Sequence, residues 1–160
     1  MTAPEIVFSQ ADTRELVAAA RELFREYAKA IDTDLEYQGF TAELAALPAP
    51  YVPPGGALVI AHGGSDAAGC VGLRPLDSRT GEMKRLYVRP AYRSCGLGKR
   101  LIEAVIHAAG QAGYSELRLD TLPSMAPAQG LYRRLGFVEI PPYSNKYLPG
   151  TRFHALKLSA

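Results

Sequence analysis

The stretch from Arg93 to Arg100 has residue types and spacing suited to binding an anion, because two glycines lie where a strand gives way to a helix. The first amides of a helix have no partner within it, and the helix dipole adds partial positive charge there. Gly96 and Gly98 carry no Cβ, so the main chain can approach phosphate oxygens closely. Arg93, Lys99 and Arg100 add positive charge. The pattern predicts a local phosphate-binding site.

The spacing of the glycines excludes two common phosphate-binding loops. A P-loop needs glycine at position 93 and serine or threonine at position 100, but arginine occupies both positions. A dinucleotide-binding fingerprint needs a third glycine at position 101, where this chain has Leu101, and no strand–helix–strand unit precedes it. The description that remains is R-x-x-G-x-G, from Arg93 to Gly98.

Hydrophobic periodicity predicts the elements that position this loop. Apolar residues at helical spacing predict two long helices, one over about 12–31, capped by Asp12 or Thr13, and one over about 97–113. Shorter runs predict strands near 6–8, 57–61, 69–74, 82–88, 117–121, 137–140 and 152–158, and short helices near 41–47 and 126–135. The order β-α-α-β-β-β-α-β-α-β-β indicates a mixed α/β domain. The proline-rich and glycine-rich region 32–56 is interpreted as a surface connection.

Length and composition favour a single domain over residues 1–160. The chain has 160 residues, of which 48% are hydrophobic and 21% charged, so it can form its own core. The formal charge of +2 is too small to indicate nucleic acid or an anionic membrane as a partner. No signal-peptide pattern and no stretch near the ~20 apolar residues of a membrane span is present. We therefore expect a cytoplasmic soluble protein.

A second pattern, A-x-x-L-Y-x-x-x-G-F, extends from Ala128 to Phe137. The stretch from Arg93 to Gly98 resembles motif A of the GNAT superfamily of acyl-CoA-dependent N-acyltransferases, whose form is Q/R-x-x-G-x-G/A. The second pattern resembles another signature of that superfamily. The resemblance implies the GNAT fold, an α/β (α+β) architecture. It consists of a single mixed, largely antiparallel sheet with a central splay, flanked by about four helices.

The resemblance also implies a co-substrate, acetyl-CoA, and no metal. In the family the diphosphate lies on the motif A amides, and the pantetheine arm pairs with the backbone of the preceding strand. An opened sheet edge offers unpaired N–H and C=O groups to such an arm. The cofactor-binding residues implied in this chain are Leu86, Tyr87, Val88, Arg93, Ser94, Cys95, Gly96, Leu97, Gly98 and Lys99.

Two residues correspond to catalytic groups of the family. Glu82 corresponds to a glutamate that acts as general base on the acceptor amine, directly or through water. Tyr132 corresponds to a tyrosine that donates a proton to the departing thiolate, as a phenol with a pKa near ~10 can. Alternatively, Glu82 is a solvated edge residue or an ion-pair partner of Lys84 or Arg85. Tyr132 is alternatively a core aromatic that packs beside Phe137.

Some positions depart from the family or carry other chemistry. Met125 stands where many relatives have an asparagine that bonds the cofactor arm, which puts that contact in doubt. Cys95 lies in the anion loop, but no histidine is near it in the sequence, so we interpret it as a loop residue and not as a nucleophile. His62, His107 and His154 are scattered, which predicts solvated side chains and no metal site.

The function implied is transfer of the acetyl group of acetyl-CoA directly to a primary amine of a small molecule. The alternatives are a catalytically inactive acyl-CoA-binding regulatory module, a protein N-acetyltransferase, and a nucleotide-phosphate-binding protein. We expect the acceptor wall in residues 27–56 and 141–154. The aromatic candidates, which are alternatively loop anchors, are Tyr37, Phe40, Tyr51, Tyr143 and Tyr147. An exposed C-terminal strand is expected to permit a homodimer.

Overall fold

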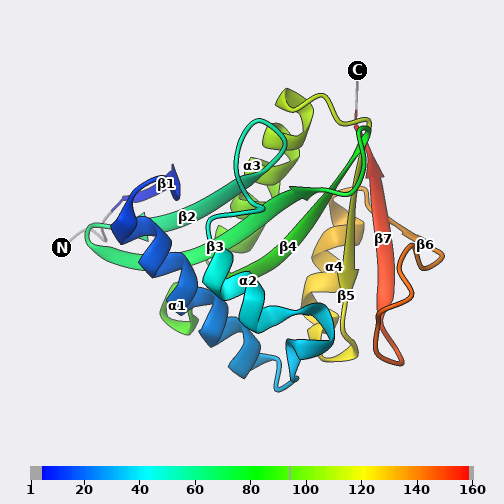
Figure 1. Ribbon diagram of the computed structural model, residues 1–160, viewed down its shortest axis with the longest axis horizontal. Helices are drawn as coiled ribbons and strands as arrows, with labels where there is room; N and C mark the ends of the chain where they lie inside the picture. The colour runs from blue at the N-terminus through cyan, green and yellow to red at the C-terminus, as the bar shows by residue number, and fades with distance from the viewer. Residues whose placement is uncertain (1–4, 94, 159–160) are drawn as a thin grey trace.

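The computed structural model describes residues 5–93 and 95–158, and its elements follow the order predicted from the sequence (Figure 1). The strands are β1 (Ile6–Gln10), β2 (Ala57–Gly63), β3 (Asp66–Pro75), β4 (Thr80–Val88), β5 (Glu116–Thr121), β6 (Val138–Ile140) and β7 (Arg152–Lys157). The α-helices are α1 (Arg14–Ala30), α2 (Phe40–Ala46), α3 (Leu97–Gln111) and α4 (Ala126–Arg134). Short 3₁₀ turns are η1 (Leu35–Gln38), η2 (Pro90–Tyr92) and η3 (Pro123–Met125).

The strands form one mixed sheet that opens in its middle. Their order is β1-β2-β3-β4-β5-β7-β6, and β4 with β5 is the parallel pair among antiparallel neighbours. That parallel pairing covers residues 80–82 of β4 and residues 116–118 of β5. Beyond Glu82 and Arg118 the two strands diverge (Figure 1). The mixed sheet with a central splay, predicted from the family resemblance, is confirmed.

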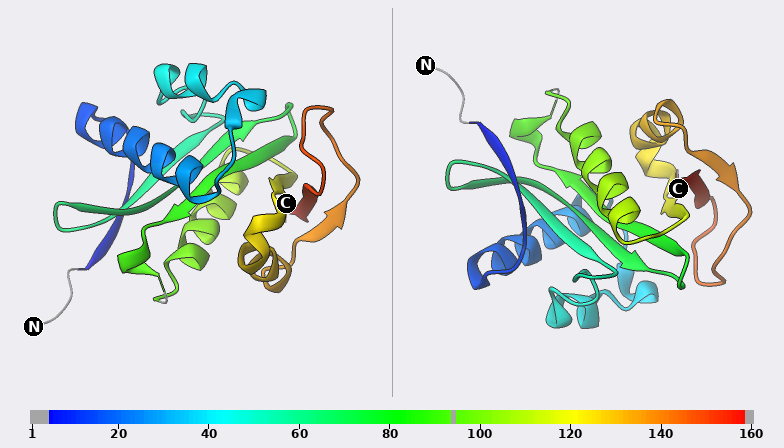
Figure 2. Two further views of the ribbon diagram at one scale, coloured as in Figure 1. Left: turned by 90° about the horizontal axis from the view of Figure 1, so that it is seen from below. Right: turned by 90° about the horizontal axis from the view of Figure 1, so that it is seen from above.

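Helices cover both faces of the sheet. Figure 2 shows α1 and α2 on one face and α3 and α4 on the other. Helix α1 begins after Thr13, whose side chain accepts a hydrogen bond from the amide of Leu16. Its buried residues, Leu23 and Phe24 among them, pack on β2 and β3. On the other face α3 packs through Leu101 and Val105 against β3 and β4.

The region 32–56 is more than a surface connection, so that interpretation was wrong. Leu35, Phe40, Leu47 and Tyr51 from this region are all buried in the core beneath α1. No periodic pattern marks this region in the sequence, because η1 and α2 are only four and seven residues long and each contributes few apolar residues. The region forms one wall of the opening between β4 and β5.

The C-terminal strand does not form an edge of the sheet. β7 lies between β5 and β6 and pairs with both, so the expectation of an exposed C-terminal strand was wrong. The short strand β6, which follows α4, takes the edge position instead. None of the helices in residues 5–93 and 95–158 is long and apolar enough to span a membrane.

Candidate active site

A bulge in β4 determines which side chains face the opening of the sheet. Lys84 pairs with Gly72 of β3, whereas Tyr87 pairs with Cys70, so two residues of β4 oppose one residue of β3. Arg85 accommodates the extra length with a left-handed backbone, φ 62°. Bulges re-aim side chains and are common beside functional sites. Here the bulge lies next to the point where β4 leaves β5.

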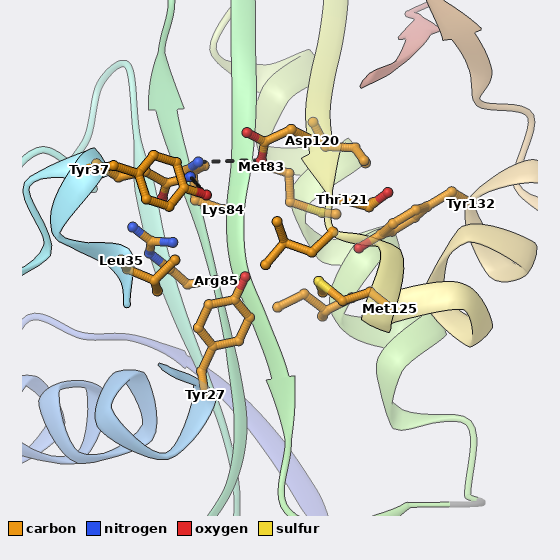
Figure 3. A pocket seen from close by; sticks show the side chains of 14 residues that line it. Tyr27, Leu35, Tyr37, Met83, Lys84, Arg85, Asp120, Thr121, Met125 and Tyr132 are labelled. Carbon is orange, nitrogen blue, oxygen red and sulfur yellow. Dashed lines mark hydrogen bonds and ion pairs between the residues drawn. The ribbon is translucent and has the colours of Figure 1, made fainter. Parts of the chain in front are cut away.

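Three hollows follow this opening. The α3 groove lies between residues 86–93 and 96–99 on one side and residues 125–134 on the other. The splay cavity lies between β4, β5, η1 and α4 (Figure 3). The outer cavity is lined by residues 36–39 and 142–146 and by polar side chains of β3, β4 and β5. The groove and the splay cavity share Tyr27, Leu86 and Met125, and the two cavities share Tyr37, Gln38, Lys84 and Asp120.

The start of α3 forms an open cradle in the α3 groove. Gly96, the N-cap residue, has a left-handed backbone (φ 76°) and no side chain to bond the first amides of the helix. Among the described residues, a Cβ added at Gly96 would meet no atom within 4 Å, and one at Gly98 would meet Leu131 at 3.8 Å. The groove holds about 860 Å³, within the ~300–1,000 Å³ of small-molecule sites. The cradle therefore has room for a phosphate group, and the first amides of α3 have no partner within the helix.

Most of the residues implied to bind the cofactor line this groove. They are Leu86, Tyr87, Val88, Arg93, Gly96, Leu97, Gly98 and Lys99. Arg93 donates from Nε to the carbonyl of Val88 at 2.9 Å, and its guanidinium lies 5.9 Å from the centre of the Tyr87 ring. Cys95 is exposed and does not line the groove; its Sγ donates to the carbonyl of Tyr92 at 2.8 Å. Ser94 lies outside the described residues.

Tyr132 reaches the splay cavity from α4 (Figure 3). The residue is 2% exposed, and its ring packs against Phe137 and His154 at centroid distances of 5.7 and 6.2 Å. Burial raises the pKa of the Tyr132 hydroxyl above its ordinary value. The ring is thus a core aromatic, as one interpretation held, while the residue also lines the cavity with a hydroxyl that keeps its proton.

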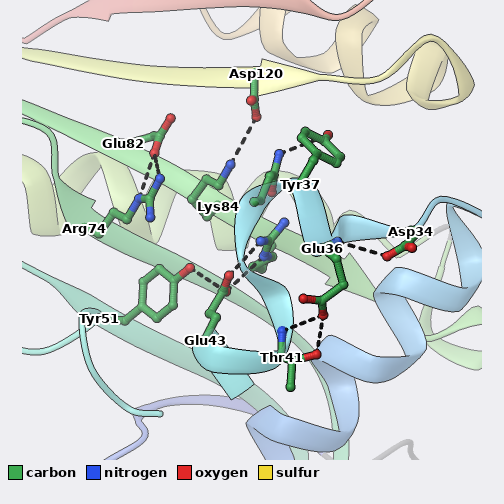
Figure 4. Close-up of polar contacts among 12 residues, drawn as sticks. Asp34, Glu36, Tyr37, Thr41, Glu43, Tyr51, Arg74, Glu82, Lys84 and Asp120 are labelled. Carbon is green, nitrogen blue, oxygen red and sulfur yellow. Dashed lines mark hydrogen bonds and ion pairs between the residues drawn. The ribbon is translucent and has the colours of Figure 1, made fainter. Parts of the chain in front are cut away.

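Glu82 is buried at the base of the outer cavity, not at a solvated edge. Its Oε1 accepts a hydrogen bond from Nε of Arg74 at 2.8 Å, because the antiparallel register places these two residues opposite each other (Figure 4). Its Oε2 accepts one from the Tyr143 hydroxyl at 2.6 Å. Burial, and then the Glu82 charge, raise the pKa of Tyr143, which keeps that hydroxyl a donor. The expected partners Lys84 and Arg85 bond other acids.

Arg85 forms a buried ion pair with Glu43 of α2. Glu43 accepts hydrogen bonds from Nε and Nη2 of Arg85 at 3.0 and 2.7 Å, and from the Tyr51 hydroxyl at 2.7 Å (Figure 4). The guanidinium also faces the rings of Tyr27 and Phe40. Burial acts to raise the pKa of Glu43, but the hydrogen bonds and charge of Arg85 outweigh it and hold that pKa below its ordinary value. The pair fixes α2 over β4.

Lys84 and Asp120 face each other across the opening. Nζ of Lys84 on β4 lies 3.4 Å from Oδ1 of Asp120 on β5, and the side chains are 6% and 20% exposed (Figure 3). Both residues line the splay cavity and the outer cavity. The contact therefore bridges the two strands beyond the point where their backbone pairing ends.

The aromatic candidates for the acceptor wall divide into two groups. Tyr37 and Tyr143 line the outer cavity. Phe40 and Tyr51 are buried in the α1–α2 core, and Tyr147 is exposed and packs its ring on Phe153. Phe40 and Tyr51 are therefore buried anchors of their segment, as the alternative interpretation held, and not part of the wall.

The histidines do not form a common site. His107 is exposed, and His62 bonds Oγ of Ser9 at 2.9 Å. His154 is buried, so the expectation of a solvated side chain was wrong there, and burial lowers its pKa. Within residues 5–93 and 95–158, no three His, Cys, Asp or Glu side chains lie close enough together to hold a metal ion.

Several polar residues of the site had not been assigned a role from the sequence. Arg74, Asp120 and Gln38 each contribute to the outer cavity, and each comes from a different element. A signal existed for Asp120, a charged residue next to the apolar Leu119 in a predicted strand. Nothing local in the sequence indicated which charges would meet, since the pairs form across strands.

A mixed sheet opened between β4 and β5, with a glycine turn at the start of α3, defines a fold of the N-acyltransferase class. Residues 14–137 match the family model described as Acetyltransferase (GNAT) family. The chain belongs to this family. It is 38% identical over 141 residues to an uncharacterised N-acetyltransferase of Schizosaccharomyces pombe. The matched region covers 86% of this chain and 85% of the relative.

Solved structures share the fold. The crystal structure of an acetyltransferase of the GNAT family from Staphylococcus aureus gives a TM-score of 0.81 at 24% identity, covering 97% of this chain and 100% of that one. The PaiA N-acetyltransferase of Thermoplasma acidophilum, solved in complex with coenzyme A, gives a TM-score of 0.70 at 18% identity, covering 96% and 99%.

Proposed function

We propose that this protein transfers the acetyl group of acetyl-CoA directly to a primary amine of a small molecule. The observation that carries the proposal is the continuity of the three hollows, because each shares lining residues with the next. The splay cavity holds only about 20 Å³, so a donor in the α3 groove and an acceptor in the outer cavity would meet across it, not inside it. Holding two reactants in contact in this way supplies a large part of the acceleration of a bimolecular reaction.

The α3 groove fits the co-substrate. The open cradle at Gly96 and Gly98 suits a diphosphate, with Lys99 and Arg93 lining the same groove. The second half of β4, which has left β5, offers backbone groups to the pantetheine amides. Met125 lines the groove and the splay cavity, so an apolar side chain borders the arm where many relatives have asparagine.

In the proposed mechanism, Glu82, Tyr143 and Tyr132 carry the proton transfers. The acceptor ammonium gives one proton to Glu82 through the Tyr143 hydroxyl, which already donates to Oε2 of Glu82. The neutral nitrogen then forms the new N–C bond to the acetyl carbonyl. As the C–S bond breaks, Tyr132 gives its proton to the sulfur, and the proton released by the new amide restores it.

The outer cavity favours a small acceptor. It is bordered by residues 36–39 and 142–146 and closed at its base by Glu82 and Arg74. Tyr37 of η1 and Asp120 of β5 line both the outer cavity and the splay cavity. The outer cavity holds about 850 Å³, so a compact amine fits within it and leaves room beside it.

The test is an acceptor screen with acetyl-CoA, measured by release of free thiol and by mass gain on the amine. We expect acetylated products from small primary amines and much slower turnover by Glu82→Gln. Reactions without an amine provide the control for thioester hydrolysis. Tight binding of acetyl-CoA without thiol release from any amine would instead support the inactive regulatory module.

A further inference from the structure

Three acid–base pairs gather on the α1–α2 face of β4 (Figure 4): Glu43–Arg85, Glu82–Arg74 and Asp120–Lys84. The two arginine pairs are closed, because each guanidinium makes two contacts of 2.7 to 3.0 Å with its carboxylate. Lys84 and Asp120 make one contact of 3.4 Å. The Lys84–Asp120 pair is therefore loosely held, although its ammonium is almost fully buried.

Unused hydrogen-bonding capacity surrounds this pair. The Lys84 ammonium has three N–H donors and Asp120 has two acceptor oxygens, while a single bond joins them in the described structure. Gln38 donates to the Tyr37 hydroxyl, but its Oε1 is buried with no partner in the described part of the chain. Lys84, Asp120 and Gln38 all line both cavities. Buried polar groups are normally paired, so these groups indicate a polar ligand.

The signs of the charges restrict what that ligand is. A polyamine would bring a second cation against Lys84, and an inorganic anion would bring a second anion against Asp120. Glu82 and Glu43 do not change this balance, since Arg74 and Arg85 pair with them. A ligand with an ammonium and a carboxylate in close proximity replaces one long contact with two charge-assisted hydrogen bonds.

We propose that the acceptor is an α-amino acid, whose carboxylate binds Lys84 and whose amino group binds Asp120 and Gln38. The inference rests on the proposed function and specifies its substrate class. Because the pair lies where the two cavities join, the amino group is held beside the splay cavity. The amino-acid side chain then extends into the outer cavity past Tyr37 and Tyr143.

The experiment compares acceptors that differ only in the carboxylate. For several side chains, the free amino acid, its carboxamide and the amine lacking the group altogether are assayed with acetyl-CoA by thiol release and product mass. Leucine, leucinamide and 3-methylbutylamine form one such set. We expect kcat/KM for the amino acid to exceed that of both analogues by about tenfold to 100-fold, as for one hydrogen bond between charged groups.

Two matched variants test the role of Lys84. In Lys84→Met the cation is gone, so the preference for the carboxylate should be lost, and kcat/KM for the amino acid and for its analogues is expected to agree to within about threefold. Lys146→Met removes the same charge at the exposed rim of the same cavity, and the preference is expected to persist. The ratio of kcat/KM for the amino acid to kcat/KM for its analogues is measured on the wild-type protein. The acceptor class is therefore decided even if Lys84→Met does not fold.

The outcomes separate this inference from the proposed function. Equal or better use of the analogues lacking a carboxylate would overturn the inference and leave amine acetylation standing. An unchanged preference in folded Lys84→Met would overturn the assignment to Lys84. If no compound of any set yields free thiol and acetylated product, the proposed function fails, and the inference fails with it.

Discussion

The α3 groove and the outer cavity are built in opposite ways. One wall of the groove comes from the continuous turn between β4 and α3, and the groups it offers to a ligand include main-chain amides. The outer cavity combines side chains from β3, β4, β5, η1 and the loop after β6. A site built from contiguous main chain leaves a motif in the sequence. A site built from distant side chains leaves only single charged residues in strands.

Two arginine–glutamate pairs make the same contrast in energetic terms. Near the groove, Arg89 at the end of β4 bonds Glu26 of α1 at 3.0 and 2.7 Å, with both side chains about 30% exposed. Beside the splay cavity, Arg85 bonds Glu43 of α2 at similar distances, but the side chains are 2% and 10% exposed. The two pairs have similar hydrogen-bond distances but differ in burial, so the loss of folding free energy on breaking each pair should differ greatly.

The largest effect should follow from breaking the buried pair. Arg85→Met leaves the Glu43 carboxylate buried without its cation, so the free energy of unfolding should fall by about 3–5 kcal/mol. Urea denaturation measures this loss. The double variant Arg85→Met, Glu43→Met should recover most of it, because no uncompensated charge remains. A double variant as unstable as the single one would show that packing, not the unpaired charge, causes the loss.

A smaller free-energy change, confined to the reaction, is expected at the junction of the two regions. Tyr132→Phe keeps the ring packed on Phe137 but removes the proton donor, so kcat should fall by about 100-fold or more. The affinity for acetyl-CoA should remain nearly unchanged. Because burial raises the pKa of Tyr132, the wild-type enzyme should lose no activity through ionisation of this residue at mildly alkaline pH.

Stopped-flow thiol release and equilibrium binding of acetyl-CoA separate the two quantities for Tyr132→Phe. Equal turnover by the variant would remove Tyr132 from the mechanism and leave it a core aromatic.

The sequence predicted the groove better than the cavities for a physical reason. Helical periodicity located the start of α3 at Leu97, and Gly96 just before it has the left-handed backbone that favours glycine. The order of the strands and α-helices followed from similar local patterns, whereas the 3₁₀ turns were not predicted. These features depend on residues close together in the chain, so a single sequence contains them.

The partners of Glu82 show what local patterns omit. Lys84 and Arg85 were the expected partners because they are near Glu82 in the sequence. Successive side chains of a strand point to opposite faces, so nearness in the sequence does not by itself bring two side chains of one strand together. Arg74 pairs with Glu82 through the β3–β4 register, and Tyr143 reaches it from the loop after β6. Burial of the region 32–56 was missed for the same reason: its core contacts are made with distant elements.

A change in the groove should affect binding without affecting stability. Gly98→Val fills the cradle in front of the first amides of α3, so the Kd for acetyl-CoA should rise about tenfold or more, the result of losing ~1.4 kcal/mol of contact. Gly110→Val is the control on the same helix, since open space also surrounds Gly110. Isothermal titration should distinguish the two. Equal affinity in both variants would place the diphosphate elsewhere.

The smallest effect on stability is expected at the partly exposed Arg89–Glu26 pair. The dependence of that effect on pH shows whether it comes from the Glu26 charge. The hydrogen bond from Arg89 holds the pKa of Glu26 below its ordinary value. The resulting stabilisation is fully present above the unfolded-state pKa and is lost as pH falls through the folded-state pKa. Glu26→Gln should therefore lower the free energy of unfolding by about 1 kcal/mol or less near neutral pH. This difference from wild type, measured by urea denaturation, should shrink as the buffer is acidified; a difference independent of pH would mean that packing of the Glu26 stem, not its charge, connects α1 to β4.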